Sequence, residues 1–398
     1  MREILVLDNH IQNYAWGSRT VISELLGRPT PSALPEAEMW IGAHPKAPST
    51  VAAPPGLGTL EAAIERDPVG LLGPNTCDHF GNQLPFLFKV LAAAAPLSIQ
   101  SHPSQEQARR GWDRENAEGI AIDSPHRNYR DPNHKPELVC ALSPFVALKG
   151  FRPLDEIVRN LEPVARRELS HELGRLAREK TPAALRALLA RLLTLDPDER
   201  SPILERTATE ATRRAGDPAW CWAGRLRERY PQDAGALAPL YLHLVVLAPG
   251  EALFLPAGEL HAYLEGAALE IMANSDNVLR GGLTPKHVDI QELLATLLFE
   301  PHAPEALQAV EIGPGERVYR TPAREFELGA LEITRDRPFQ AGVGREVEIL
   351  LGLSGDATLL AEGRATPLGR GRSVLVPASL PAYTITGEGR LARARVPT

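Results

Sequence analysis

The sequence predicts a mainly β protein made of small barrels, with an α-helical domain inserted into the first of them. Short apolar runs broken by Pro, Gly and Asn fill residues 1–151 and return after residue 241, which is typical of strands joined by turns. Between these two parts the apolar residues follow helical spacing. A strand–turn–strand pattern just after the helical part recurs near the C-terminus, which indicates a second barrel.

The helical part is predicted from apolar periodicity and a start signal. Leu185, Leu188, Leu189 and Leu192 lie at i, i+3, i+4 and i+7, the spacing of one helix face. A Thr181–Pro182 pair reads as an N-cap followed by proline at the first helical position. We expect a catalytic barrel domain at 1–151 plus 238–312, a helical domain at 152–237 and a C-terminal barrel at 313–398. A shorter helical stretch is predicted at 290–298.

The internal repeat suggests that only one barrel carries a metal. Residues 252–263 and 373–383 both read as a strand, a proline turn and a second strand. The second copy is one residue shorter and has Pro381 where the first has His261. We interpret the copies as two related barrels, the second without metal ligands. Chance similarity between two common turn units is the alternative.

Composition excludes some partners. The 398-residue chain has a net charge of −7, which argues against nucleic acid or an anionic membrane as the main partner. Its three cysteines, Cys77, Cys140 and Cys221, show no C-x-x-C spacing, so free thiols in a reducing, cytoplasmic setting are expected. The sequence shows no signal-peptide pattern, and its longest uncharged apolar run, 90–99, is too short to span a bilayer.

Four residues together suggest a metal site. Gln100 and His102 lie two apart on a predicted strand, so their side chains face the same way with Cα atoms about 6.6 Å apart. Glu137 stands at a predicted strand start, and His261 follows a Pro–Ala–Gly turn. Each alone has an ordinary structural explanation. Together, two imidazoles and a carboxylate suit catalytic zinc, and the neutral amide leaves a net positive charge that stabilises an anionic intermediate.

A polar segment at 274–289 supplies candidate substrate contacts. Arg280 has a fixed fork of donors that suits a phosphate or an enediolate oxygen. Lys286 supplies a point charge or a proton, and Gly281–Gly282 permits close backbone approach. A surface loop with scattered charges is the alternative for this segment.

Six ordered stretches resemble the type I, zinc-containing mannose-6-phosphate isomerase family. They are residues 13–18, 37–45, 85–91, 97–103, 133–137 and 277–286. The resemblance implies cupin (jelly-roll) barrels with an inserted helical domain. It also implies one Zn²⁺ per chain, held by Gln100, His102, Glu137 and His261.

The resemblance further implies the active-site positions. It places the family's arginine on Arg280, with Glu270 and Lys286 as further catalytic candidates. Its surrounding polar and phosphate-contacting positions fall on Trp16, Lys89, Ser98, Lys135, Glu270 and Lys286. Asp276 and His287, in the polar segment at 274–289, are further candidates for substrate contact. Two residues depart from the family pattern: Gly281 replaces the usual Ala, and His287 stands where an aromatic residue is common.

The implied reaction interconverts mannose 6-phosphate and fructose 6-phosphate through a cis-enediol. A base must reach the C2 proton; Glu270 is the first candidate, with Asp276, His287 and Lys286 as alternatives. Two other functions stay open on sequence: an isomerase for another aldose phosphate, and a non-catalytic metal-bound cupin that binds a sugar phosphate. A monomer with a small-molecule partner is expected.

Overall fold

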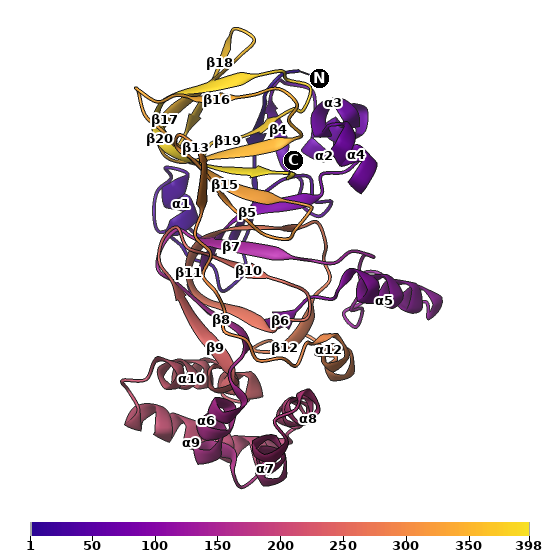
Figure 1. Ribbon diagram of the computed structural model, residues 1–398, viewed down its shortest axis with the longest axis vertical. Coiled ribbons are helices and arrows are strands. Elements are labelled where there is room, and N and C mark those ends of the chain that lie inside the picture. The colour runs from indigo at the N-terminus through magenta and orange to yellow at the C-terminus, as the bar shows by residue number, and fades with distance from the viewer. Residues whose placement is uncertain (1, 398) are drawn as a thin grey trace.

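The computed structural model describes residues 2–397 and is mainly β, as predicted. Two ten-stranded antiparallel sheets are stacked along the long axis of the molecule, and the helices of residues 154–229 gather beyond the first sheet (Figure 1). The chain order is strands, then helices, then strands, so the helical part is an insertion. No helix among the described residues is long and apolar enough to cross a membrane.

The first sheet is centred on the long strand β11, which pairs with β5, β6, β7 and β8. Its strands are β2 (His10–Gln12), β3 (Glu38–Ile41), β5 (Phe86–Ala93), β6 (Ile99–Ser101), β7 (Glu137–Ala141), β8 (Phe145–Phe151), β9 (Leu242–Leu247), β10 (Ala252–Leu255), β11 (His261–Ala273) and β12 (Leu279–Gly282). Because β11 touches strands from distant parts of the chain, it gathers their side chains onto one surface.

The second sheet contains mostly C-terminal strands. They are β13 (Val310–Gly313), β14 (Glu316–Tyr319), β15 (Glu327–Ile333), β16 (Phe339–Ala341), β17 (Glu348–Ala361), β18 (Arg364–Gly369), β19 (Ser373–Val376) and β20 (Tyr383–Arg395). Two N-terminal strands, β1 (Leu5–Asp8) and β4 (Thr50–Ala53), join it through the pairing of β1 with β19. The N-terminal segment thus contributes strands to both sheets, which ties them together.

The helical insertion leaves β8 and returns on β9, which pair with each other. It contains α6 (Leu154–Ala165), α7 (Ser170–Glu179), α8 (Pro182–Leu193), α9 (Pro197–Arg213), α10 (Pro218–Arg229), η1 (Ala234–Leu237) and α11 (Ala238–Tyr241). The four predicted leucines of α8 are buried, and Thr181 caps the helix by accepting from the Ala184 amide. The same apolar cluster includes Ile99 and Leu279, so the helices and the first barrel share a core.

The prediction of strands and turns throughout 1–151 was wrong in several places. Helices α1 (Val21–Leu25), α2 (Leu60–Arg66), α3 (Pro68–Leu72), α4 (Pro74–Phe80) and α5 (Gln105–Ala117) lie there. Helix α5 buries only Ala108, Gly111 and Glu115, so it carries no apolar stripe to reveal it. Its sequence signal was the capping box between Ser104 and Gln107. Helix α12 (Ile290–Thr296) lies within the predicted 290–298 stretch.

The two repeat units adopt the same strand–turn–strand arrangement. Strands β10 and β11 form one unit, and β19 and β20 form the other. The three cysteines are free thiols, as expected, and Cys140 is buried.

Glycine 111 provides a test of how α5 packs. A Cβ on Gly111 would meet the Tyr129 ring at 2.2 Å. We expect Gly111→Ala to lower the free energy of unfolding, although Ala normally stabilises a helix interior by about 1 kcal/mol relative to Gly. Urea denaturation measures the change.

The matched control is Gly174→Ala in α7, where the nearest atom is the flexible Arg178 guanidinium at 3.2 Å. We expect this variant to be as stable as the parent or more stable. Equal stabilisation by both substitutions would contradict the packing of Tyr129 on α5.

Candidate metal centre

Three predicted ligands converge at one buried point. His102, Glu137 and His261 each offer a ligand atom, and these atoms lie within 4.8 Å of one another. His102 follows β6, Glu137 opens β7, and His261 opens β11. All three side chains are buried. It is the only such cluster of His, Cys, Asp or Glu among residues 2–397.

Backbone carbonyls fix the orientation of both imidazoles. His102 Nδ1 lies 2.8 Å from the Asn277 carbonyl, and His261 Nδ1 lies 3.0 Å from the Glu259 carbonyl. A carbonyl only accepts, so each Nδ1 donates, and each Nε2 of a neutral ring is left with a lone pair. Neither Nε2 has a hydrogen-bond partner.

The lone pairs face a carboxylate. His102 Nε2 is 3.3 Å from Glu137 Oε1, and His261 Nε2 is 3.5 Å from Oε2. With neutral rings, these contacts set acceptor against acceptor in a buried site, which is unfavourable unless a cation lies between them. The donor set therefore fits a divalent metal, and two imidazoles with one carboxylate are typical of zinc.

Gln100 lies beside this cluster in the sheet. It is the cross-strand partner of His261 on β11 and of Arg280 on β12. Directly paired residues place their side chains on the same face, with Cβ atoms about 5 Å apart. Gln100 is therefore positioned to offer its amide oxygen as a fourth ligand, with Arg280 next to it.

Charges around the cluster set its protonation. Lys135 Nζ lies 2.8 Å from Glu137 Oε1. Burial opposes ionisation of Glu137, but Lys135 and the two imidazoles outweigh it and hold the pKa of this carboxyl well below its usual range. Burial, together with Lys135, lowers the pKa of His102 to about 4. Both groups are thus in their metal-binding forms at neutral pH.

A second buried ion pair lies next to the metal cluster. Lys89 Nζ is 2.8 Å from Glu270 Oε2 and 3.7 Å from Glu38 Oε1. Burial raises the pKa of Glu270, and Lys89 only partly opposes this. Burial also disfavours the charged form of Lys89, but the two carboxylates outweigh it and raise its pKa. This pairing follows from register, because Glu270 and Lys89 are directly opposed on β11 and β5.

The cluster adjoins a cavity of about 800 Å³. Six of the predicted residues line this active-site cavity: Lys89, Lys135, Asp276, Arg280, Lys286 and His287. Glu270 lies behind Lys89 and is not part of the lining. Trp16 and Ser98 are not part of it either; Trp16 packs against an apolar cluster that includes Tyr263.

One side of this cavity is rich in cations. Burial and the neighbouring Arg130 lower the pKa of Arg280. Burial, Arg280, Arg130 and Lys46 lower the pKa of Lys286. Of these four cations, Lys46 alone has an acidic partner within residues 2–397, with its Nζ 2.7 Å from Asp276 Oδ2. Cations that repel one another in a cavity are stabilised by a bound anion.

Sequence reasoning missed Lys46 and Arg130 as site residues. Lys46 follows directly on the 37–45 stretch, so proximity to that motif was an available signal. Arg130 lies in a loop without regular structure, and no spacing rule indicates that its side chain turns toward the cavity.

Comparison with known proteins gives consistent matches. Residues 4–154 match the family described as phosphomannose isomerase type I, catalytic domain, and residues 327–396 match the mannose-6-phosphate isomerase cupin domain. Mannose-6-phosphate isomerase of Escherichia coli is 43% identical over 391 residues, covering 97% of this chain and 98% of its own. The human enzyme of that name is 32% identical and covers 81% of this chain and 80% of its own.

Solved structures agree with these sequence matches. A zinc-bound mannose 6-phosphate isomerase is 40% identical, with a TM-score of 0.92 and coverage of 99% of this chain and 100% of its own. The apo form from Salmonella typhimurium also has a TM-score of 0.92, at 40% identity and full coverage of both chains.

The low pKa of His102 can be tested in metal-free protein. Its folded pKa of about 4 lies below the ordinary 6.5, so between these values the unfolded chain binds the extra proton. The contribution of His102 to stability is therefore lost as pH falls from 6.5 toward 4. NMR titration of the imidazole should show a neutral ring until the pH approaches 4; a midpoint at 6.5 would contradict this environment.

Proposed function

The chain belongs to the type I phosphomannose isomerase family, and we propose that it is a zinc-dependent enzyme that interconverts mannose 6-phosphate and fructose 6-phosphate. The observation that carries this proposal is the pair of unpartnered imidazole nitrogens facing Glu137, beside a cavity rich in cations. A metal at that point and a phosphate at the cations would hold the two ends of one sugar phosphate.

We assign the zinc to His102, Glu137, His261 and Gln100. When bound, zinc polarises sugar oxygens and stabilises negative charge that develops on them. The chain's own contribution is orientation: Asn277 and Glu259 carbonyls aim the two imidazoles, and Lys135 keeps Glu137 ionised.

The phosphate end of the substrate is assigned to Arg280 and Lys286, with Arg130 and Lys46 nearby. A phosphate dianion removes the mutual repulsion of these groups, which raises their pKa values toward normal. Arg280 is also the ladder neighbour of Gln100. Because Arg280 lies next to the proposed ligand Gln100, a sugar phosphate bound by Arg280 would extend toward the metal ligands.

We propose Glu270 as the base, acting through Lys89. Lys89 lines the cavity, whereas Glu270 lies behind it at 2.8 Å. Neighbouring carboxylates hold Lys89 protonated, so the C2 proton can move to Lys89 only as Lys89 passes its own proton to Glu270. The raised pKa of Glu270 favours that transfer. Asp276, His287 and Lys286 are the alternatives, and all three line the cavity.

We further propose that the enzyme works as a monomer in the cytoplasm. Three free thiols suit a reducing compartment. Exposed large apolar residues are scattered over separate elements, such as Val246 on β9 and Leu360 on β17. Sedimentation at a mass of 43.3 kDa supports the monomer, and twice that mass would overturn it.

The activity is tested by a coupled assay of fructose 6-phosphate formed from mannose 6-phosphate. We expect turnover with zinc, loss of turnover after chelation, and recovery when zinc returns, because the buried acceptor cluster needs its cation. Parallel assays with other aldose 6-phosphates address substrate choice. Binding of fructose 6-phosphate without turnover on any aldose phosphate would contradict the proposed reaction.

The assignment of Arg280 predicts a separation between turnover and metal binding. We expect Arg280→Ala to lower kcat/KM by about 10²–10³-fold, as for loss of a group that stabilises transition-state charge. Zinc content, measured by atomic absorption, should stay at one per chain. The exposed Arg317→Ala on β14 is the matched control. Equal loss of zinc and activity would assign Arg280 to the metal site instead.

The assignment of Glu270 predicts an effect on the chemical step. We expect Glu270→Gln to lower kcat by about 10²–10⁴-fold with little change in KM, because the amide cannot take the proton from Lys89. The control is Glu265→Gln, an exposed position on the same strand. If the variant keeps the parent's kcat and pH profile, the base is one of the alternatives.

A further inference from the structure

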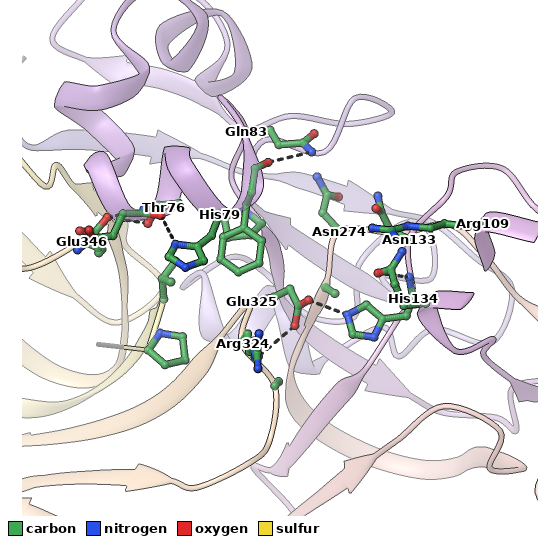
Figure 2. Close-up of a pocket in the computed structure, with 18 of the residues that line it drawn as sticks. Thr76, His79, Gln83, Arg109, Asn133, His134, Asn274, Arg324, Glu325 and Glu346 are labelled. Atoms are coloured by element: carbon green, nitrogen blue, oxygen red, sulfur yellow. Dashed lines mark hydrogen bonds and ion pairs between the residues drawn. The ribbon is translucent and has the colours of Figure 1, made fainter. Parts of the chain in front are cut away.

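A second and larger cavity lies between the first barrel and the C-terminal part of the chain. Its volume is about 1010 Å³ (Figure 2). One side comes from α4, α5 and residues 133–134 and 273–274. The other side comes from residues 323–325, Gly344, Glu346 and the C-terminal residues 396–397. We call this space the interdomain cavity; none of the residues assigned to the reaction lines it.

The interdomain cavity and the active-site cavity share a wall. Two chain segments, 133–135 and 272–276, contribute residues to both spaces. Asn133, His134, Ala273 and Asn274 line the interdomain cavity, whereas Lys135, Met272, Ser275 and Asp276 line the active-site cavity. A ligand in one space therefore contacts residues that are direct chain neighbours of residues lining the other.

The wall is connected to the metal ligands. Asn133 O accepts from Ser275 Oγ at 3.2 Å and from Asn277 Nδ2 at 2.8 Å. The carbonyl of the same Asn277 aims His102, and Lys135 contacts Glu137. On the other side, Glu325 of the C-terminal part holds His134 at 2.6 Å (Figure 2). A displacement of residue 133 or 134 is therefore transmitted to two proposed zinc ligands. The path to His102 runs through the hydrogen bonds of Asn277, and the path to Glu137 runs through Lys135.

The uncommitted charges in the interdomain cavity are positive. Arg109 on α5 and Arg324 after β14 are exposed, and neither guanidinium contacts a carboxylate within the described residues. The two acids of the lining are already engaged, since Glu325 pairs with His134, and Glu346 accepts from the Thr76 hydroxyl at 2.7 Å. Figure 2 shows Arg109 and Arg324 on different sides of the space.

These features match a polar anion that spans the cavity. A volume of this size holds a metabolite larger than the substrate. Two separate guanidinium groups select two anionic groups, and guanidinium is the side-chain group that best matches phosphate geometry. The side chains of Gln83, Asn133 and Asn274, which also line the cavity, offer partners to hydroxyl groups.

We propose that the interdomain cavity is an effector site for a metabolite carrying two phosphate groups, and that its occupancy changes turnover through the shared wall. Binding itself is independent of the proposed reaction, whereas the change in turnover rests on it. The two parts are measured separately.

The experiment uses the zinc-loaded, full-length enzyme and glucose 1,6-bisphosphate as the probe. Titration calorimetry in the presence of saturating mannose 6-phosphate should show one binding event, because the active site is filled. In the double variant Arg109→Ala/Arg324→Ala the Kd should rise at least about tenfold, the loss expected for charge-assisted contacts. In the coupled assay, saturating probe should change kcat by about fivefold, within the usual range of coupling between sites.

Arg110→Ala is the matched control, since Arg110 is an exposed neighbour on α5 that does not line the cavity. It should bind the probe as the parent does. All three proteins should share the same basal kcat and zinc content.

Displacement of the probe by mannose 6-phosphate, or the same Kd in parent and double variant, would overturn the site. Binding with unchanged kcat would overturn its role as an effector site. Absence of basal turnover in the parent would instead count against the proposed reaction, while the calorimetry still decides whether the site exists.

Discussion

The site is organised around one buried group of hydrogen-bond acceptors that a cation would satisfy. Two imidazole lone pairs and a carboxylate face one another at 3.3–3.5 Å, out of reach of solvent. Backbone carbonyls hold each ring in the tautomer that leaves Nε2 unprotonated. Because these carbonyls lie in the short loops that connect β10 to β11 and β11 to β12, the fold itself orients the two imidazoles.

In the region that matches the cupin domain, a buried carboxylate at a comparable position has protein side chains as partners. Glu348 is the first residue of β17, as Glu137 is of β7. Glu348 is paired with Val376, the last residue of β19, and Glu137 is paired with Leu255, the last residue of β10. Tyr383 donates to Glu348 at 2.7 Å, and Arg345 lies 3.2 Å from the same carboxylate. Arginine side chains balance the charge of this buried acid.

Charge is distributed unevenly in a way that suits an anionic substrate. The chain is acidic, with a net charge of −7, yet Arg130, Arg280, Lys286 and Lys46 gather at one cavity. Mutual repulsion among these cations raises the free energy of the cavity when no anion is bound, and a bound anion removes this repulsion. The interdomain cavity repeats the pattern on the far side of a shared wall, with Arg109 and Arg324 uncommitted.

The sequence by itself determined the fold class, the helical insertion, the family and the meeting of His102, Glu137 and His261, since strand alternation, helical spacing and ordered motifs are local properties. It did not reveal α5, which lacks an apolar stripe, nor the roles of Lys46 and Arg130, whose side chains reach the cavity from loops. Only the tertiary structure decided that Glu270 lies behind Lys89 and that Trp16 packs against an apolar cluster. These outcomes depend on the register between distant strands and on the packing of two sheets, which no single stretch of residues encodes.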